Sequence, residues 1–342
     1  HWKYGVLVFV AAAALMGLSI LIYVVLDGFD LGVGVLFPFA NQSERDRMVA
    51  SIGPFWDANE TWLVLAVGLL LVAFPQAHGV VLTALYLPVS LMLIGLTLRG
   101  VAFDFRVKAR DEHKERWNRA FFGGSFVAAF AQGYMLGELI LGFELSAFAT
   151  AFSCFIGLCL ASGYALLGSA WLLAKTSDKL QRKAITWAKR SMLLTATGVA
   201  AVSLARPLLS ERIFDKWFSF PEIVLLAPMP MMFCLMIGLL FVALKRLPTA
   251  DASFAWFPFV ATIVLFVLAF FGCAGGEALR ARTVLVELVA GEVPLVRDQL
   301  GRDARIGRRA RTGEMTRPVG CSRSASATGS SAIGLVTTTR GS

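Results

Sequence analysis

Repeated apolar runs of about 20 residues limit what this chain can fold into more than any other feature. A helix of that length spans the hydrocarbon core of a bilayer, where every backbone polar group needs an internal partner. The chain is 57% hydrophobic and only 16% charged, whereas soluble domains are about 25% charged. We therefore predict an all-α, polytopic transmembrane helix bundle. The eight predicted spans cover approximately residues 6–27, 60–77, 79–98, 120–143, 150–174, 191–209, 222–244 and 254–273.

The charges of the loops predict how these spans are oriented. The loops that follow odd-numbered spans hold 17 lysines and arginines, and the opposite side holds four. Cytoplasmic loops carry such an excess, so we expect the N-terminus outside and the loops after odd-numbered spans in the cytoplasm. The net charge of +9 follows this distribution and does not indicate a nucleic-acid partner.

The segment from Trp56 to Trp62, Trp-Asp-Ala-Asn-Glu-Thr-Trp, places two carboxyl groups and an amide just before an apolar run. Ionisable groups at the edge of hydrocarbon are costly and commonly functional. Asp57 and Glu60 are three residues apart, so on a helix they share a face, with Asn59 to one side. The alternative is an interfacial helix start, with Asp57 as the N-cap and the two tryptophans in the aromatic belt.

A second acidic motif, Asp-Gly-Phe-Asp-Leu-Gly-Val-Gly, lies at the end of the first span. Its aspartates are three residues apart inside an apolar stretch, so this span could continue to Phe39. Its glycines, with the earlier Gly17, permit close approach of another helix. The alternative is an Asx turn that ends the helix, with the glycines as breakers. The motif's aspartates and glycines are Asp27, Gly28, Asp30, Gly32 and Gly34.

The acidic residues of the first three spans are expected on one face of the membrane. The third span ends at Arg99, and Asp104 follows shortly after. By the predicted orientation both lie on the cytoplasmic side, together with the acids of the two motifs. Carboxyl groups that burial and neighbouring like charges hold near working pH can relay protons, so such a cluster suits proton or cation uptake. The alternatives are snorkelling for Arg99 and a salt bridge with a loop arginine for Asp104.

The sequence predicts no metal or haem ligation by this chain. His1 is terminal, His113 falls in a charged segment, residues 111–116, that we expect to be a solvated loop, and His78 falls in a short outer turn. No pair of histidines is placed to face across spans, as a haem would need. A further expectation is a short amphipathic helix on the cytoplasmic surface within residues 41–55.

The C-terminal residues 274–342 differ abruptly from the rest. They contain 11 arginines, no lysine and none of the chain's 40 aromatic residues. A segment rich in serine, arginine and glycine builds no core. We therefore predict a membrane domain at residues 1–273 and a disordered tail at 274–342. The tail is expected either to come from a shifted reading frame or to be a basic cytoplasmic extension.

These motifs resemble subunit II of cytochrome bd quinol oxidases over about residues 4–272, with glycine and alanine details similar to the cyanide-insensitive branch. The family's ninth membrane helix is not recognisable here. The segments that carry the resemblance are residues 27–34, 56–62 and 99–106, and Gly-Tyr-Ala-Leu-Leu-Gly at 163–168 with Trp171 and Lys175.

The resemblance implies a multi-pass protein of the bacterial inner membrane, paired with a haem-bearing subunit I that holds haem d and two b-type haems and oxidises quinol. It allows for a bound quinone and a small accessory transmembrane subunit, and it implies no haem ligated by this chain. Asp30 and Arg99 match positions that support the haem site. The positions that match the family's proton path are Asp27 or Asp30, Asp57 and Asp104, and Glu60 adds a further titratable group.

The expected mechanism is proton delivery from the cytoplasm along these acids toward the partner's haems, where O₂ is reduced to water. No catalytic centre is expected in this chain itself. Two alternatives from other classes are a secondary transporter coupled to protons or cations, and a purely structural membrane subunit.

Overall fold

The computed structural model describes residues 2–143, 146–209, 228–247 and 252–272, and within these ranges it contains helices and no strand. Six helices of this part are long and apolar enough to cross a membrane. The predicted all-α transmembrane bundle is therefore confirmed. The six spans are Leu7–Phe39, Trp56–Ala73, Tyr86–Lys108, Asp111–Leu141, Ala147–Lys175 and Phe254–Gly272.

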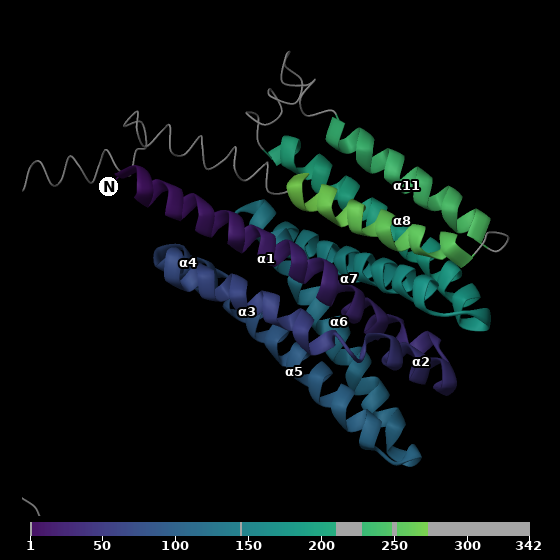
Figure 1. The fold of residues 1–342 in the computed structure, drawn as a ribbon. Coiled ribbons are helices and arrows are strands. Elements are labelled where there is room, and N and C mark those ends of the chain that lie inside the picture. Colours follow the sequence, from purple (N-terminus) through teal and green to yellow (C-terminus); the bar gives the residue numbers. More distant parts are fainter. Residues whose placement is uncertain (1, 144–145, 210–227, 248–251, 273–342) are drawn as a thin grey trace, which may run out of the picture. The chain divides into compact units, whose positions relative to one another are not determined.

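From α1 to α8 the helices follow one another along the chain with short connections (Figure 1). The predicted span at 191–209 falls on α8, and the part of the span at 222–244 that the structure describes, residues 228–244, falls on α11. The predicted tail at 274–342 lies outside the described residues. The elements are α1 (Trp2–Leu36), η1 (Phe37–Phe39), α2 (Gln42–Ile52), α3 (Trp56–Ala73), α4 (Pro75–Ala84), α5 (Tyr86–Lys108), α6 (Asp111–Leu141), α7 (Ala147–Lys175), α8 (Asp178–Leu209), α11 (Pro228–Arg246) and η3 (Ala252–Trp256), with a last helix over residues 257–272.

The first span continues through its acidic motif. Helix α1 runs without interruption to Leu36, and the 3₁₀ helix η1 extends it to Phe39. The Asx-turn alternative is therefore wrong, and Asp27 and Asp30 lie inside a membrane helix. The reason is that apolar residues surround the motif on both sides, so their burial favours a continuous helix over a turn.

The charged segment 111–116 forms the first turns of α6, so the prediction of a loop there is wrong. Two acids stand in the first turn, Asp111 and Glu112, where the helix dipole favours negative charge. The Lys114 ammonium lies 2.8 Å from the Asp111 carboxylate, one turn away. The segment is mostly exposed, as predicted, but helical.

The boundary between the second and third membrane helices lies at a different place from the predicted one. Helix α3 ends at Ala73, the short α4 begins at Pro75, and α5 begins only at Tyr86. Proline lacks a backbone N–H, so it suits the first turn of a new helix and not the interior of an old one. Helix α5 then continues to Lys108, well past its predicted end, and Asp104 belongs to it.

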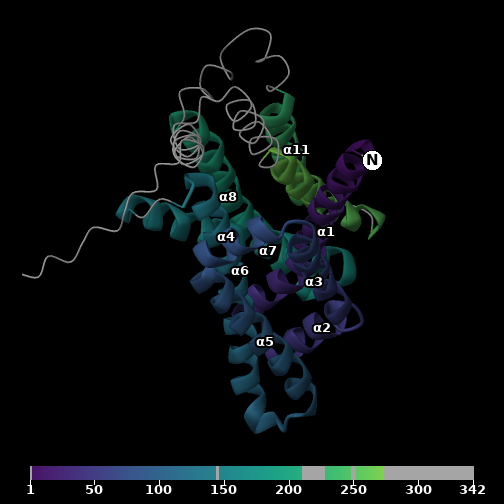
Figure 2. The ribbon, with the colours of Figure 1, turned by 90° about the vertical axis from the view of Figure 1, so that its left-hand side faces the viewer.

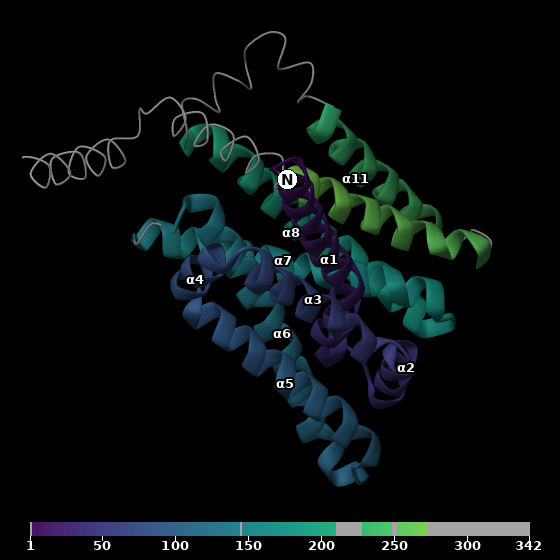
Figure 3. The same ribbon diagram turned by 60° about the vertical axis from the view of Figure 1, so that its left-hand side comes forward.

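Helix α1 packs against α3, α6 and α7, and the consecutive pairs α5–α6, α6–α7 and α7–α8 pack as hairpins (Figures 1 and 3). The closest backbone approach involves Gly32 of α1 and Gly168 of α7. A Cβ added at Gly168 would lie 2.5 Å from the Gly32 carbonyl carbon, and one at Gly32 would overlap the Tyr164 carbonyl oxygen. Only glycine lets the two helices cross this closely.

Aromatic residues from three helices build the core beside this crossing. The ring of Phe29 on α1 stacks on Trp171 of α7 with centroids 4.5 Å apart. Phe259 of the last helix lies 5.9 Å from Phe29 and 5.2 Å from Trp171. Aromatic burial of this kind dominates packing energy, and it fixes the end of α1 that carries the acidic motif.

Candidate functional site

Arg99 is at the centre of a buried polar cluster. It stands on α5 and is only 1% exposed. Its Nη1 donates a hydrogen bond to Asp27 Oδ1 on α1 at 2.6 Å, and its Nη2 donates to the Glu60 carboxylate on α3. Charge-assisted hydrogen bonds to both carboxylates offset the cost of burying the guanidinium. The arginine therefore ties the first three membrane helices together.

Asn59 joins the second aspartate of α1 to the same cluster. Its Nδ2 donates to Asp30 Oδ2 at 2.8 Å and contacts the Leu26 carbonyl at 3.4 Å. Both Asn59 and Asp30 are buried. The amide thus bridges α3 to α1 one turn away from the ion pair of Arg99.

In each of the two aspartates, one carboxylate oxygen has no hydrogen-bond partner of ordinary geometry. Asp27 Oδ2 and Asp30 Oδ1 are buried and accept no hydrogen bond of ordinary geometry within the described part of the chain, although the Tyr23 hydroxyl lies close enough to Asp27 to interact with it. Buried polar atoms nearly always have a partner, so these two oxygens mark a place where a proton can be bound. The cavity beside Asp30 is too small for a water molecule. Its lining consists of Asp30, Ile52, Trp56, Arg99, Phe103 and Phe121.

The structure does not bring Asp57 and Asp104 into this cluster. Both are exposed on the isolated chain, while Asn59 is buried and the Glu60 side chain is 29% exposed. Asp57 and Glu60 lie three residues apart on α3, as predicted, but only Glu60 reaches the buried cluster. The N-cap alternative for Asp57 is also wrong, because Phe55 occupies that position and Asp57 lies inside the first turn of α3.

The two tryptophans of the second motif differ in their surroundings. The Trp56 ring lies 5.0 Å from Phe103, and the Arg99 guanidinium carbon is 5.8 Å from its centroid. Cation–π contact at that distance stabilises a desolvated arginine. Trp62 is half-buried two turns further along α3. Trp56 thus covers the cluster, and Trp62 does not.

The motif glycines of α1 lie where other helices approach it. A Cβ at Gly28 would lie 2.8 Å from the Tyr164 ring, and one at Gly34 would overlap the Ser125 hydroxyl of α6. Gly17 has nothing within 4 Å of such a Cβ. The prediction of close helix approach therefore agrees with the structure at the motif glycines and fails at Gly17.

Three further polar residues next to the cluster were not predicted from the sequence. The Tyr164 hydroxyl of α7 donates to Gln132 Oε1 of α6 at 2.7 Å, and Gln132 Nε2 donates to the Tyr23 hydroxyl of α1 at 2.9 Å. Tyr23 stands one turn before Asp27, and this i,i+4 spacing was the available signal. The chain of hydrogen bonds extends the polar region from α1 to α6 and α7.

Close packing of α5 on α6 positions Arg99, and this too was not predicted. A Cβ at Gly124 of α6 would lie 2.7 Å from the Arg99 backbone nitrogen, and one at Gly95 would lie 2.8 Å from the Ala128 nitrogen. Small residues at such crossings let membrane helices approach closely. Gly95 precedes Arg99 by four residues and Gly124 precedes Ala128 by four, and this spacing was a weak signal in the sequence.

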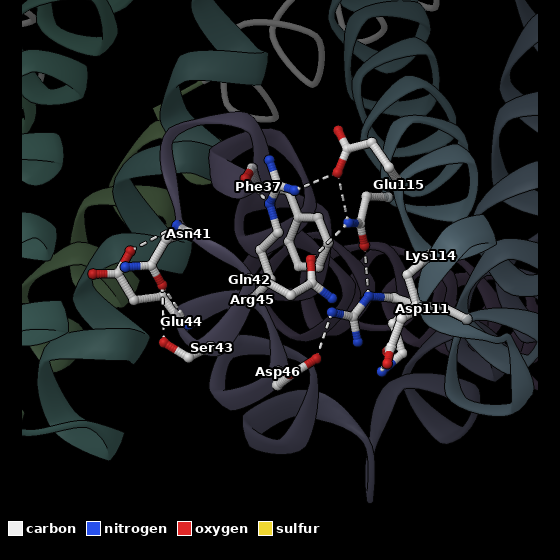
Figure 4. A network of polar contacts seen from close by, with 12 residues as sticks. Phe37, Asn41, Gln42, Ser43, Glu44, Arg45, Asp46, Asp111, Lys114 and Glu115 are labelled. Atoms are coloured by element: carbon white, nitrogen blue, oxygen red, sulfur yellow. Dashed lines mark hydrogen bonds and ion pairs between the residues drawn. The ribbon is translucent and has the colours of Figure 1, made fainter.

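A second polar network fixes α2, the predicted surface helix (Figures 2 and 4). Arg106 of α5 donates to Asn118 Oδ1 on α6 and to Asp46 on α2, each at 2.7 Å. Arg45 of α2 donates to Glu115 of α6 at 2.7 Å. Side chains from three helices thus hold α2 next to the end of α1, and Ile52 at its C-terminus lines the cavity beside Asp30.

Glu44 secures the other side of α2. Asn41 caps the helix in a capping box with Glu44, and the Lys183 ammonium of α8 lies 2.8 Å from the Glu44 carboxylate. Burial raises the pKa of Glu44. The hydrogen bonds from Lys183 and the Asn41 backbone, together with the charges of Lys183 and Arg47, lower it by more, so the pKa lies below its ordinary value.

Comparison with known proteins decides the family. The family model for cytochrome bd terminal oxidase subunit II matches residues 8–279. The chain belongs to this family. The cytochrome bd ubiquinol oxidase subunit 2 of Bacillus subtilis is 30% identical over 65% of this chain and 68% of its own length. The bd-I subunit 2 of Escherichia coli K12 is 37% identical, over 37% of this chain and 35% of its own length.

A cytochrome bd subunit II is part of an oxidoreductase complex, and this chain is a multi-pass protein of the bacterial inner membrane. The family implies that the haems belong to the partner subunit. The described residues of this chain do not fit a haem, because His78 on α4 and His113 on α6 are not paired. The described residues also contain no group of three metal-binding side chains.

Proposed function

We propose that this chain is subunit II of a complex that oxidises quinol and reduces O₂, and that its buried acids carry protons from the cytoplasm toward the partner's haems. The observation that carries this proposal is the buried Arg99, held by carboxylates of two other membrane helices. Ionisable residues inside membranes are costly and commonly mark proton pathways. Asp30 and Arg99 also support the partner's haem site in this proposal.

The charge balance of the cluster favours the storage of a proton. Three carboxyl groups, those of Asp27, Asp30 and Glu60, accompany the single guanidinium of Arg99. Two uncompensated negative charges in a buried site would be strongly unfavourable. A proton on one carboxyl group removes part of that cost. The oxygens without partners, Asp27 Oδ2 and Asp30 Oδ1, are suitable positions for it.

The exposed acids suit the outer end of the same path. Asp104 and Asp57 are accessible on the isolated chain, on the face where the loop charges predict the cytoplasm. Glu60 is partly exposed and contacts Arg99, so it links the exposed acids to the buried pair. Protons would pass from Asp104 and Asp57 to Glu60 and then to Asp27 and Asp30. Because these protons are taken up from the cytoplasmic side only, the proposed reaction is electrogenic.

Replacing Asp30 by asparagine in the assembled complex tests the proposal. Asparagine has the same shape and still accepts a hydrogen bond from Asn59, but it cannot take up or release a proton. We expect quinol-driven O₂ consumption per haem-loaded complex to fall about 100-fold or more. Turnover is expressed per haem, because Asp30 is also proposed to support the haem site. Asp111→Asn is the matched control, because Asp111 is 93% exposed and outside the cluster. Normal turnover of an intact Asp30→Asn complex would contradict the relay.

Asp57→Asn tests the outer end of the path separately. We expect slower O₂ reduction in a complex that still assembles, with a smaller effect than at Asp30 because Asp104 can deliver protons to Glu60 as well. The double variant Asp57→Asn/Asp104→Asn should be slower than either single variant. Equal rates in all three variants and in the wild type would restrict the path to the buried cluster.

Purification from native membranes separates the oxidase from the alternative functions. Co-purification with a haem-bearing subunit supports the proposal, and a colourless chain on its own supports a cation-coupled transporter. For a purely structural subunit, Asp30→Asn would change the amount of assembled complex and leave the turnover of each complex unaltered.

A further inference from the structure

A basic groove of about 440 Å³ lies between the C-terminal ends of α2 and α7 and the start of α3. Two cationic side chains line it, Arg47 of α2 and Lys175 of α7, together with the hydroxyl groups of Ser51 and Ser177 and the ring of Phe55. None of its lining residues is acidic. The groove is separate from the buried cluster of Arg99 and has no part in the proposed proton path.

Both cations are positioned by groups other than carboxylates. The Lys175 ammonium lies 5.0 Å from the ring centroids of both Trp171 and Trp256. Arg47 Nη2 donates to the Ser177 carbonyl across the groove at 3.3 Å. Within the described ranges neither side chain forms a salt bridge. The Arg47 charge also acts on the Glu44 carboxylate, but neither cation is neutralised in a salt bridge, so the pair favours an external anion.

The groove lies at the depth of the lipid headgroups. Lys175 is the last residue of the membrane span α7, and Trp56, which begins the span α3, directly follows the lining residue Phe55. Tryptophan and lysine at the ends of spans mark the boundary between hydrocarbon and water. Phe55 is 48% exposed at the edge of the groove, which is apolar surface that an acyl chain can cover.

We propose that this groove binds the phosphate group of an anionic phospholipid. Lys175 and Arg47 hold the phosphate, the hydroxyl groups of Ser51 and Ser177 contact the glycerol part, and Phe55 lies along the first carbons of the acyl chain. A soluble phosphate would use the two cations and leave Phe55 exposed, so the position of the groove selects the lipid. Basic pockets beside membrane helices recognise anionic headgroups in this way.

The test measures lipid retained by the purified oxidase complex. The complex is exchanged into detergent micelles that contain phosphatidylglycerol or phosphatidylcholine, and bound lipid is counted by native mass spectrometry. We expect phosphatidylglycerol to be retained and phosphatidylcholine to be lost. Lys175→Gln and Arg47→Gln should each weaken phosphatidylglycerol binding about fivefold. Lys108→Gln, which removes an exposed lysine at the end of α5, should leave it unchanged.

Three results would overturn the inference. They are equal retention of the two lipids by the wild type, unchanged binding in both groove variants, and displacement of phosphatidylglycerol by millimolar inorganic phosphate, which would indicate a site for a soluble anion. The haem spectrum of each variant verifies that the complex has assembled. If one groove variant does not assemble, the other still tests whether the retained lipid occupies the groove.

Discussion

Gly32 of α1 and Gly168 of α7 meet backbone to backbone, with no side chain between them. This contact lies one turn beyond the aspartates of the first motif and just before Trp171, which stacks on Phe29. The crossing therefore sets the distance between the acidic end of α1 and the aromatic core. The position of Asp27 and Asp30 depends on two residues that carry no side-chain chemistry.

Gly32→Ala should destabilise the subunit by about 1–3 kcal/mol, because the added methyl group overlaps the Tyr164 carbonyl oxygen and separates the helices. Thermal unfolding of the purified complex measures the effect as a lower Tm. Gly68→Ala on α3 is the matched control, since a Cβ there meets nothing within 4 Å. It should leave the Tm unchanged or raise it slightly, because alanine favours a helix more than glycine does. Similar Tm values for the two variants would show that the crossing tolerates a side chain.

Arg99→Gln should cost about 3–5 kcal/mol, because it leaves the carboxylates of Asp27 and Glu60 buried without their cation. The measurement is the Tm together with the amount of complex that carries haem. Arg119→Gln is the control, since the Arg119 side chain is 81% exposed and its ion pair with Glu115 is long, at 3.7 Å. Adding Asp27→Asn to Arg99→Gln should recover part of the loss, because a neutral amide has no charge to compensate. Additive losses in the double variant would mean that the two side chains do not interact.

Tyr164→Phe should destabilise the chain by about 1–2 kcal/mol, because Gln132 Oε1 then loses its buried donor. The phenyl ring keeps its shape and its stacking on Phe266, whose centroid is 5.8 Å away, so packing alone predicts no change. Tyr86→Phe serves as the control, since Tyr86 is 72% exposed. Thermal unfolding distinguishes the two variants, and an equal Tm would mean that the hydrogen-bonded chain contributes nothing to stability.

The pairing of Glu44 with Lys183 should make stability depend on pH. The pKa of Glu44 is lowered in the folded chain, so the unfolded chain binds its proton more readily. The stabilisation is therefore present above the ordinary glutamate pKa of about 4.3 and is lost as the pH falls through the lower folded value. The Tm difference between wild type and Glu44→Gln should be largest near neutral pH and shrink in acid. A difference that is independent of pH would show that the carboxylate charge does not matter.

Sequence patterns predicted the helical membrane fold because long apolar runs leave a chain no other solution. They also placed Asp27, Asp30, Glu60 and Arg99 in the same region, since membrane spans of similar length bring their ends to common depths. Spacing along one helix could not establish which acids turn inward. Asn59 faces α1, which packs on that side of α3, and the Glu60 side chain reaches Arg99 of α5, whereas Asp57 is left exposed.

Contacts between distant segments of the chain could not be predicted from the sequence. The link from Tyr23 through Gln132 to Tyr164 joins residues of three helices, and each residue by itself fits an apolar span. The helical start of α6 was missed for a local reason. A run of charged residues was interpreted as a loop, although its acids stand first and Lys114 follows one turn later, an order that suits a helix N-terminus.

The buried cluster is drawn entirely from the first hundred residues, and this has a consequence for how the protein is made. Arg99 is the last of the set to leave the ribosome, after Asp27, Asp30 and Glu60 have already been synthesised. Chains fold from the N-terminal end during synthesis, so the arginine meets its counter-charges as soon as its own helix enters the bilayer. The Arg99 guanidinium therefore depends on neither α6 nor any later helix for its counter-charges.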